Sequence, residues 1–186
     1  MNHATGLDHI GIVCRDLDAT AQTFEAAGFV VTPLAAHEGG RTGNRCVMFR
    51  DGGYIELVST LPGGTSATLD RFLARHEGAH ILALTIDDPE AVAERLNRAG
   101  ITSNASRSER PVDSAGPIAR FTLLTPPDRP EGRVHLIRHE TPGALWQDRF
   151  LHHPNGATAL AEVVLTVAEP AQTAAWYSRL AGRSVV

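Results

Sequence analysis

Four polar side chains stand inside strongly apolar stretches of this 186-residue chain: His9, Glu56, His80 and His135. A buried imidazole or carboxylate is costly unless it has a partner, so each of these groups is expected to be paired. Imidazole nitrogens and carboxylate oxygens together suit a divalent transition metal, and the mixed set does not choose among zinc, iron, manganese, nickel and cobalt. Glu56 is also a candidate catalytic base, because a carboxylate that substrate displaces from a metal can accept a proton.

Two of these histidines occupy matching places in an internal repeat. The segment 7–13 returns as 78–84, which aligns His9 with His80. Seven residues after its histidine, each copy has an aspartate that leads into a helical stretch closed by a glycine: Asp16 and Gly28 in the first copy, Asp87 and Gly100 in the second. Because a repeat places equivalent side chains in equivalent positions, the two copies are expected to face each other and share one site.

The last strand of each repeat supplies the other two candidates. Residues 53–56 align with residues 132–135, and since alternate side chains of a strand share a face, the four polar residues are expected to point into one concave sheet. His135 and His139 compete for the fourth ligand position, because they lie about 13 Å apart at about 3.3 Å per residue. His135 is favoured, since it falls where the repeat places Glu56.

Apolar periodicity and turn residues predict an α+β fold with two paired βαβββ modules forming a curved mixed sheet around a cleft. The first module is expected to hold a strand at 7–14, a helix from Asp18 to Gly28, a strand at 29–32 and a hairpin of 45–49 with 54–58. The second is expected to hold a strand at 78–84, a helix from Asp88 to Gly100, a strand from Ile101 and a hairpin of 120–124 with 133–137. Residues 104–117 are polar and predict a mobile or substrate-covering loop.

The repeat also sets the expected boundaries. These are residues 5–60 for the first module, 61–77 for a linker helix, 78–140 for the second module, 141–157 for a connecting segment and 158–186 for the start of an incomplete third module. A strand and a helix alone leave apolar side chains such as Val163, Leu165 and Val167 to be covered by something else. The pattern therefore predicts a fragment of a longer protein or a homo-oligomer.

Six further residues are candidates for substrate contacts: Asn44, Arg45, Arg120, His139, His153 and Asn155. Structural roles compete with this interpretation. Asn44 suits a turn, the two arginines suit solvated strand edges, and His153 and Asn155 lie in a His-Pro-Asn-Gly sequence that suits a rigid turn.

Composition excludes several classes of partner. The chain has 17 basic and 21 acidic residues, with no basic run, so no nucleic acid is expected as a partner. Its apolar runs are far shorter than a membrane span, and the first residues lack the pattern of a signal peptide. A globular cytoplasmic protein is expected, with Cys14 and Cys46 as buried free thiols.

Several motifs give the chain a family resemblance. The βαβββ repeat, the Leu-Asp-His opening at residues 7–9 and the Tyr-Ile-Glu-Leu-Val strand at residues 54–58 resemble the vicinal oxygen chelate superfamily, which includes glyoxalase I, extradiol dioxygenases, epimerases and antibiotic-resistance proteins. The sequences at residues 42–45, 139–142 with Trp146, and 153–157 are similar to bacterial glyoxalase-like domain proteins.

The resemblance implies a metal that binds two adjacent oxygens of a small-molecule substrate. His9, Glu56 and His80 match the superfamily's ligand positions, whereas most members would have a glutamate where this chain has His135. The expected function is a metal-dependent enzyme of the glyoxalase or dioxygenase type. The alternatives are a small-molecule binding or resistance protein without catalysis, and an interaction module of a longer protein.

Overall fold

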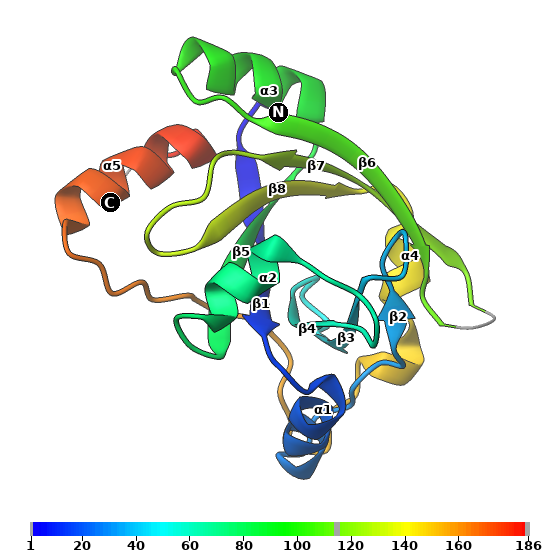
Figure 1. The fold of residues 1–186 in the computed structure, drawn as a ribbon. Coiled ribbons are helices and arrows are strands. Elements are labelled where there is room, and N and C mark those ends of the chain that lie inside the picture. Colours follow the sequence, from blue (N-terminus) through cyan, green and yellow to red (C-terminus); the bar gives the residue numbers. More distant parts are fainter. Residues whose placement is uncertain (1, 114–115, 185–186) are drawn as a thin grey trace.

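The computed structural model describes residues 2–113 and 116–184, and the described strands form one eight-stranded sheet in the order β2-β3-β4-β1-β5-β8-β7-β6 (Figure 1). The first module consists of β1 (Ala4–Val13), α1 (Leu17–Ala26), β2 (Ala35–Ala36), β3 (Thr42–Met48) and β4 (Tyr54–Thr60). The second consists of β5 (Gly78–Ile86), α3 (Pro89–Arg98), β6 (Asn104–Pro111), β7 (Ile118–Thr125) and β8 (Arg133–His139). The predicted α+β fold with paired βαβββ modules and a curved mixed sheet is confirmed.

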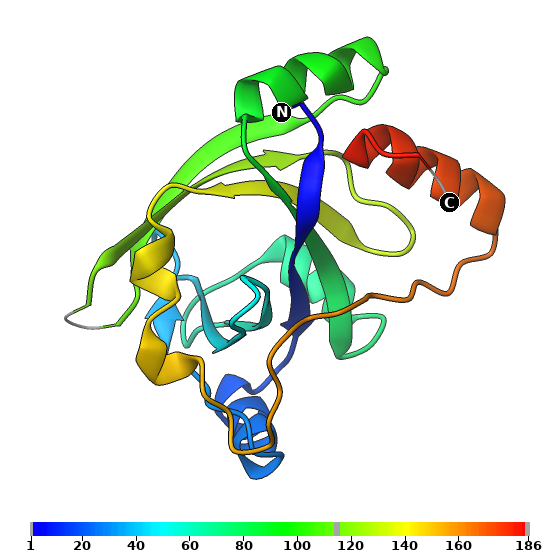
Figure 2. The ribbon, with the colours of Figure 1, turned by 180° about the vertical axis from the view of Figure 1, so that it is seen from behind.

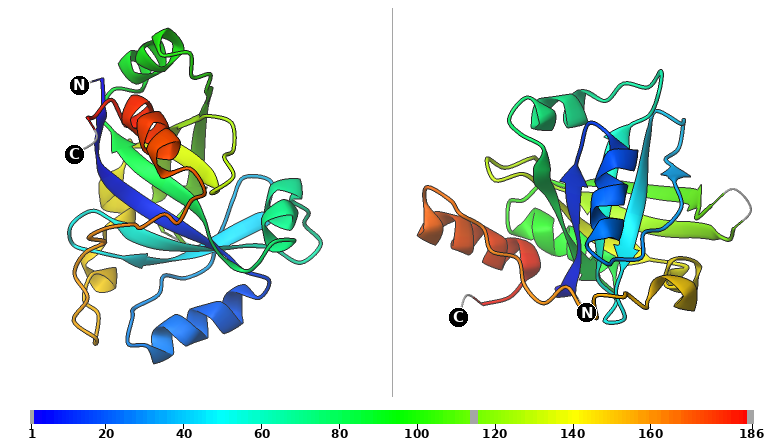
Figure 3. Two further views of the ribbon diagram at one scale, coloured as in Figure 1. Left: turned by 90° about the vertical axis from the view of Figure 1, so that its left-hand side faces the viewer. Right: turned by 90° about the horizontal axis from the view of Figure 1, so that it is seen from below.

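The two modules join through their first strands. β1 and β5 pair antiparallel at the centre of the sheet, while each also pairs in parallel with the last strand of its own module, β4 or β8. The first helices, α1 and α3, lie at opposite ends of the molecule (Figure 3). A short helix, α2 (Ala67–Leu73), connects the modules, and α4 (Pro142–Leu145) and a 3₁₀ turn (Asp148–Phe150) follow the second. No helix in the described part of the chain is long and apolar enough to cross a membrane.

The helix caps reveal the true register of the repeat. The side chain of Asp16 accepts a hydrogen bond from the Ala19 amide and begins α1, and in the second module the residue with this role is Asp88 rather than Asp87. Counting back seven residues from each cap aligns His9 with Ile81. The predicted alignment of His9 with His80 is therefore off by one residue.

Two other expected elements differ in the structure. Residues 29–32 form no strand, although the Thr32 amide donates to the Cys46 carbonyl. The expected loop at 104–117 is largely strand β6, which pairs with β7 from Asn104 to Pro111; residues 114 and 115 lie outside the described part. The polar composition of β6 suggested a loop because this edge strand exposes most of its side chains to solvent.

The segment after residue 157 first contacts the first module, where the Leu160 amide donates to Asp51, and its helix then packs on the second module. Residues 157–168 form no strand and cross the molecule to α5 (Pro170–Ala181), as Figure 2 shows. Leu180 of α5 is fully buried in a cluster with Ile86, Val92 and Leu96. Val164 remains 80% exposed, so the described chain leaves part of this segment uncovered, and the expected self-association stays a prediction.

Candidate functional site

A cavity of about 300 Å³ lies between the two modules and holds three of the four expected metal ligands. His9 of β1, Glu56 of β4 and His135 of β8 all line it. The strand pairing explains why: His9 lies beside Tyr54 and Ile81 beside Arg133, so Glu56 and His135 occupy equivalent positions two residues further along. Both modules therefore contribute polar groups to one cavity.

Glu56 is the centre of the polar groups in this cavity. Its Oε2 lies 3.9 Å from Nε2 of His9, and its Oε1 lies 3.7 Å from Nε2 of His37 and accepts a hydrogen bond from the Asn44 side-chain amide. Burial raises the pKa of Glu56, but the interactions with His37, His9 and Asn44 outweigh it and hold the pKa well below the usual range. The carboxylate is therefore ionised at neutral pH.

His37 is a site residue that the sequence did not single out. It precedes the polar, glycine-rich segment that leads into β3, where a histidine is ordinarily a solvated loop residue. A hydrogen bond between its Nδ1 and the Thr42 hydroxyl, at 2.8 Å, turns Nε2 toward Glu56. No repeat signal marks His37, because β2 and β6, the second strands of the modules, differ in length and composition.

His9 is held in place by its sequence neighbour, Asp8. The pairing of β1 with β5 matches Leu7 to Leu84 and His9 to Ala83, so Asp8 is an extra residue in the ladder. Such a bulge re-aims side chains, and here it allows the adjacent Asp8 and His9 side chains to meet. Nδ1 of His9 donates to Asp8 at 2.7 Å, which leaves Nε2 directed toward Glu56.

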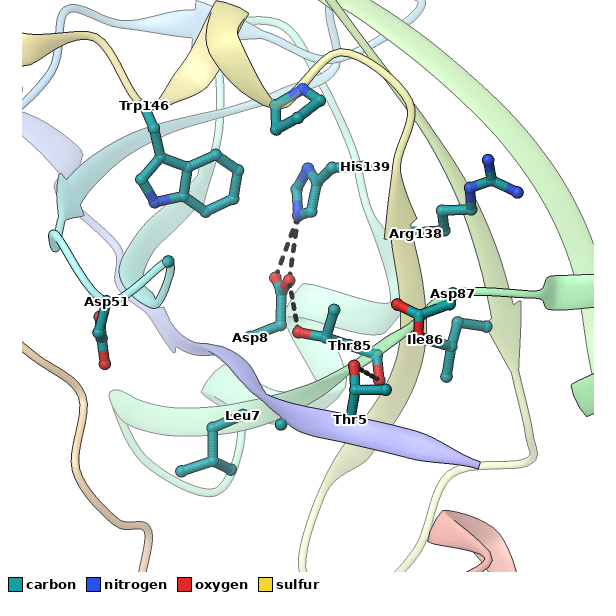
Figure 4. Close-up of a pocket in the computed structure, with 13 residues that line it drawn as sticks. Thr5, Leu7, Asp8, Asp51, Thr85, Ile86, Asp87, Arg138, His139 and Trp146 are labelled. Atoms are coloured by element: carbon teal, nitrogen blue, oxygen red, sulfur yellow. Dashed lines mark hydrogen bonds and ion pairs between the residues drawn. The ribbon is translucent and has the colours of Figure 1, made fainter. Parts of the chain in front are cut away.

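Asp8 joins His9 to His139, the last residue of β8. Nε2 of His139 donates to the Asp8 carboxylate at 3.1 Å, and the Thr85 hydroxyl donates to it at 3.3 Å (Figure 4). Burial raises the pKa of Asp8, but the hydrogen bonds from His139 and His9 lower it to about 2. The buried Asp8 carboxylate thus fixes one ring nitrogen of each imidazole: Nδ1 of His9 and Nε2 of His139.

Acid should expose the contribution of Asp8 to stability. Because its native pKa of about 2 is below the ordinary value of 3.8, its stabilisation is present above the ordinary value and is lost as pH falls through the native one. The shift corresponds to about 2 kcal/mol. Urea unfolding between pH 5 and pH 2 should show this loss in the wild type and not in Asp8→Asn. Asp87→Asn, at an exposed aspartate nearby, should behave like the wild type, and equal acid sensitivity in all three proteins would contradict the assignment.

His135 is available as a neutral ligand or acceptor. Its Nδ1 is hydrogen-bonded to the Thr125 hydroxyl at 2.8 Å. Burial lowers the pKa of His135 to about 4, with a further contribution from the nearby His9. The imidazole therefore stays uncharged at neutral pH, which is the form that a metal ion requires.

His80 lies outside this cavity. Its ring stacks on Phe72 of α2, with centroids 4.9 Å apart, and its Nε2 donates to the His76 carbonyl at 2.9 Å. Ile81 lines the cavity instead. A shift of one residue along a strand exchanges its two faces, so the offset in the repeat alignment explains the change.

His139 is also absent from the cavity with Glu56. It lines a separate pocket of about 590 Å³, where its ring meets the edge of Trp146 with centroids 4.8 Å apart (Figure 4). It touches the candidate site through Asp8 and through the rings of Tyr54 and Phe121, which line that cavity. The expectation that His139 competes with His135 for one ligand position therefore has no support in the geometry.

Among the six proposed substrate contacts, only Asn44 lines the cavity with Glu56. Arg45 pairs with Asp18 at 2.8 Å, and Arg120 pairs with Glu109 at 3.0 Å. These two arginines satisfy carboxylates outside the cavity.

His153 and Asn155 attach the connecting segment to the first module. His153 accepts a hydrogen bond from the Val30 amide and donates one to the Met48 carbonyl, both at 2.9 Å. The Asn155 side-chain amide donates to the Ala27 carbonyl at the end of α1. Both side chains have structural partners.

The donors in the cavity suit a divalent metal in kind. His9 and His135 supply imidazole nitrogens, Glu56 supplies an ionised carboxylate, and Asp8 provides the outer hydrogen bond that commonly orients a ligating histidine. In the described residues, however, no three His, Cys, Asp or Glu side chains converge closely enough to form a metal site. The types of donor fit a metal ion, but the side chains of His9, Glu56 and His135 would have to move closer together to bind one.

Comparisons with known proteins agree with the architecture. A family model described as a glyoxalase-like domain matches residues 7–181. A methylmalonyl-CoA epimerase variant from Streptomyces coelicolor, in complex with 2-nitronate-propionyl-CoA, is 28% identical over 72% of this chain and 96% of that chain, with a TM-score of 0.52. No curated protein matches the chain.

Two further structures share the fold at lower identity. A hypothetical protein from Staphylococcus aureus has a TM-score of 0.60 and is 18% identical over 78% of this chain and 64% of that chain. A 4-hydroxymandelate synthase mutant from Streptomyces coelicolor has a TM-score of 0.55 and is 18% identical over 74% of this chain and 48% of that chain. This chain therefore covers less than two thirds of the length of each of these two relatives.

Proposed function

This chain belongs to the glyoxalase-like domain family of the vicinal oxygen chelate superfamily, and from that premise we propose that it is a metal-dependent enzyme acting on a small molecule with two adjacent oxygens. The observation that carries the proposal is the ionised Glu56, which shares one small cavity with His9 and His135. The epimerase to which the chain is 28% identical binds a small-molecule CoA ligand, which supports a small-molecule substrate here.

We assign the metal ligands to His9, Glu56 and His135. Two imidazoles and one carboxylate form a set that leaves coordination positions open for substrate oxygens. Ile81 lines the cavity where the repeat predicted a ligand from His80, and its apolar side chain supplies no donor there. When bound, the metal would polarise a carbonyl or enolate oxygen and stabilise its developing charge.

Each side chain then has a defined task. Glu56, once substrate displaces it from the metal, would take a proton from substrate carbon or oxygen. Asn44 and His37 hold its Oε1, which leaves Oε2 on the side of His9. Asp8 accepts a hydrogen bond from Nδ1 of His9 and so keeps that nitrogen protonated. The lone pair on Nε2 is then free to bind the metal.

Metal loading followed by turnover tests the proposal. Protein purified without a His tag and dialysed against each candidate metal should retain about one equivalent per chain. The loaded protein is then screened against 2-oxo and 2-hydroxy compounds, with turnover followed as solvent-deuterium exchange by NMR or as oxygen uptake. Glu56→Gln should lower the rate by at least about 10²- to 10⁴-fold, because it removes the base and also one of the three assigned ligands.

Glu109→Gln is the matched control, since Glu109 is an exposed carboxylate paired with Arg120 on the outside of the sheet. Its rate should equal that of the wild type. A protein that binds these compounds equally well without any retained metal would instead support a small-molecule binding or resistance protein. The absence of three convergent donors in the described residues is the observation that favours this alternative.

A further inference from the structure

Arg110 is a buried cation on an otherwise exposed strand. It lies in β6, where it is the one residue with a buried side chain among eight. Only 6% of its surface is exposed, and it lines the same cavity as Glu56 and His135. The register of β6 against β7 places it beside Ala119, which is itself fully buried.

The guanidinium group of Arg110 has no carboxylate partner in the described part of the chain. No ion pair joins it to Glu56, whose contacts are His9, His37 and Asn44. Its neighbours are the Cys46 thiol and the Tyr54 ring: burial raises the pKa of Cys46 to about 12, and the nearby charge of Arg110 opposes that rise only in part. A buried charge without a counter-ion is strongly unfavourable.

Arg133, the other arginine that lines this cavity, has a carboxylate partner. Its guanidinium donates to both carboxylate oxygens of Asp128, at 2.8 and 3.1 Å. Its charge is thus compensated within the protein. Arg110 differs because the compensating anion has to come from outside the described chain.

We propose that Arg110 binds the carboxylate of the substrate, so that the enzyme acts on small organic acids. This inference rests on the proposed function, since it names the substrate class of the same cavity. A guanidinium binds a carboxylate through two parallel hydrogen bonds, which fixes the orientation of the acid as well as its affinity. The acid's adjacent oxygen would then face the side of the cavity with His9 and Glu56.

The other residues that line the cavity indicate what the rest of the substrate looks like. Apolar side chains from both modules and from α2 form the walls: Val58, Leu69, Phe121, Leu123 and Ile137. Glu56 is the one carboxylate among the described residues that line the cavity, and a bound metal would make the site more positive. A volume of about 300 Å³ suits a compact acid with an apolar body.

Calorimetric titration with 4-methyl-2-oxopentanoate, its methyl ester and inorganic phosphate tests the inference, with and without bound metal. The wild type should prefer the acid to the ester. Arg110→Gln should weaken acid binding by roughly 10- to 100-fold and leave ester binding unchanged, because it removes a charge-assisted pair. Arg110→Lys should restore part of the affinity. Arg120→Gln, at an exposed arginine on β7, should bind the acid like the wild type.

Thermal unfolding gives a second readout that a structural arginine would not produce. Arg110→Met should raise the Tm of the ligand-free protein, because an uncompensated buried charge is replaced by an apolar side chain of similar length. The same variant should lose the increase in Tm that the acid confers on the wild type.

Three results would overturn the inference: equal binding of acid and ester, acid binding unchanged in Arg110→Gln, or phosphate binding that exceeds acid binding and depends on Arg110. The metal-free titrations separate it from the proposed function. Arg110-dependent acid binding in a protein that retains no metal supports the inference while the enzyme proposal fails. Metal binding without any preference for the acid refutes only the inference.

Discussion

Replacing His9 with glutamine is expected to weaken binding of a divalent metal by more than about 100-fold, because even residues that only orient a ligand contribute about 10- to 100-fold. Replacing His80 with glutamine is expected to leave metal binding unchanged. The reason is the register of the repeat: His9 lines the cavity with Glu56, whereas His80 stacks on Phe72 and donates to the His76 carbonyl. Competition with a chromogenic chelator measures both affinities.

The His80 variant is a stringent control, since both histidines are buried and lie in the first strand of a module. Circular dichroism should show that both variants keep the fold. Equal loss of metal in the two variants would restore the alignment of His9 with His80. Retention of metal by the His9 variant would remove His9 from the ligand set.

The second large effect concerns the packing of α5. Leu180→Ala is expected to lower the free energy of unfolding by about 2–5 kcal/mol, because a fully buried leucine leaves a cavity when it is truncated. Leu180 has no exposed surface and packs with Val92 and Leu96 of α3. Denaturant unfolding with a constant m-value measures the loss.

Val164→Ala is the matched control in the same part of the chain. Its side chain is 80% exposed, so a change within about 0.5 kcal/mol is expected for the monomer. A larger loss for Val164→Ala than for Leu180→Ala would mean that a second copy covers residues 163–167. In that case the third-module interpretation of this segment would describe the assembly better than its packing on α3.

Much of the candidate site could be predicted from local sequence. His9 and Glu56 each stand in a strand whose partner is set by its own module, so a repeat of apolar strands and turn glycines was sufficient to bring them near each other. His135 followed from the equivalence of residues 53–56 and 132–135, which the strand register bears out. These relations depend on short-range pattern and on the parallel pairing of strands within a module.

The position of His80 could not be predicted in the same way. The residues around it, Ala79 and Ile81, give no alternation of polar and apolar side chains, because β5 lies at the centre of the sheet and is largely buried on both faces. Without alternation, a one-residue slip has no local penalty, yet it exchanges the two faces of the strand. The helix cap at Asp88 was the signal in the sequence that fixed the register.

By itself, the sequence determined the α+β class, the two βαβββ modules and the residue types that face each other across them, because strand and helix periods and cap residues act over a few positions. Tertiary structure alone decided that Asp8 bulges out of the ladder to join His9 to His139, and that Arg110 is buried on a polar edge strand. The first contact joins Asp8 to His139, 131 positions further along the chain, and the second brings Arg110 of the second module next to Cys46 and Tyr54 of the first. No local pattern encodes either contact. The group to which we attribute substrate specificity, Arg110, is therefore one that the fold, rather than the sequence pattern, brings into the site.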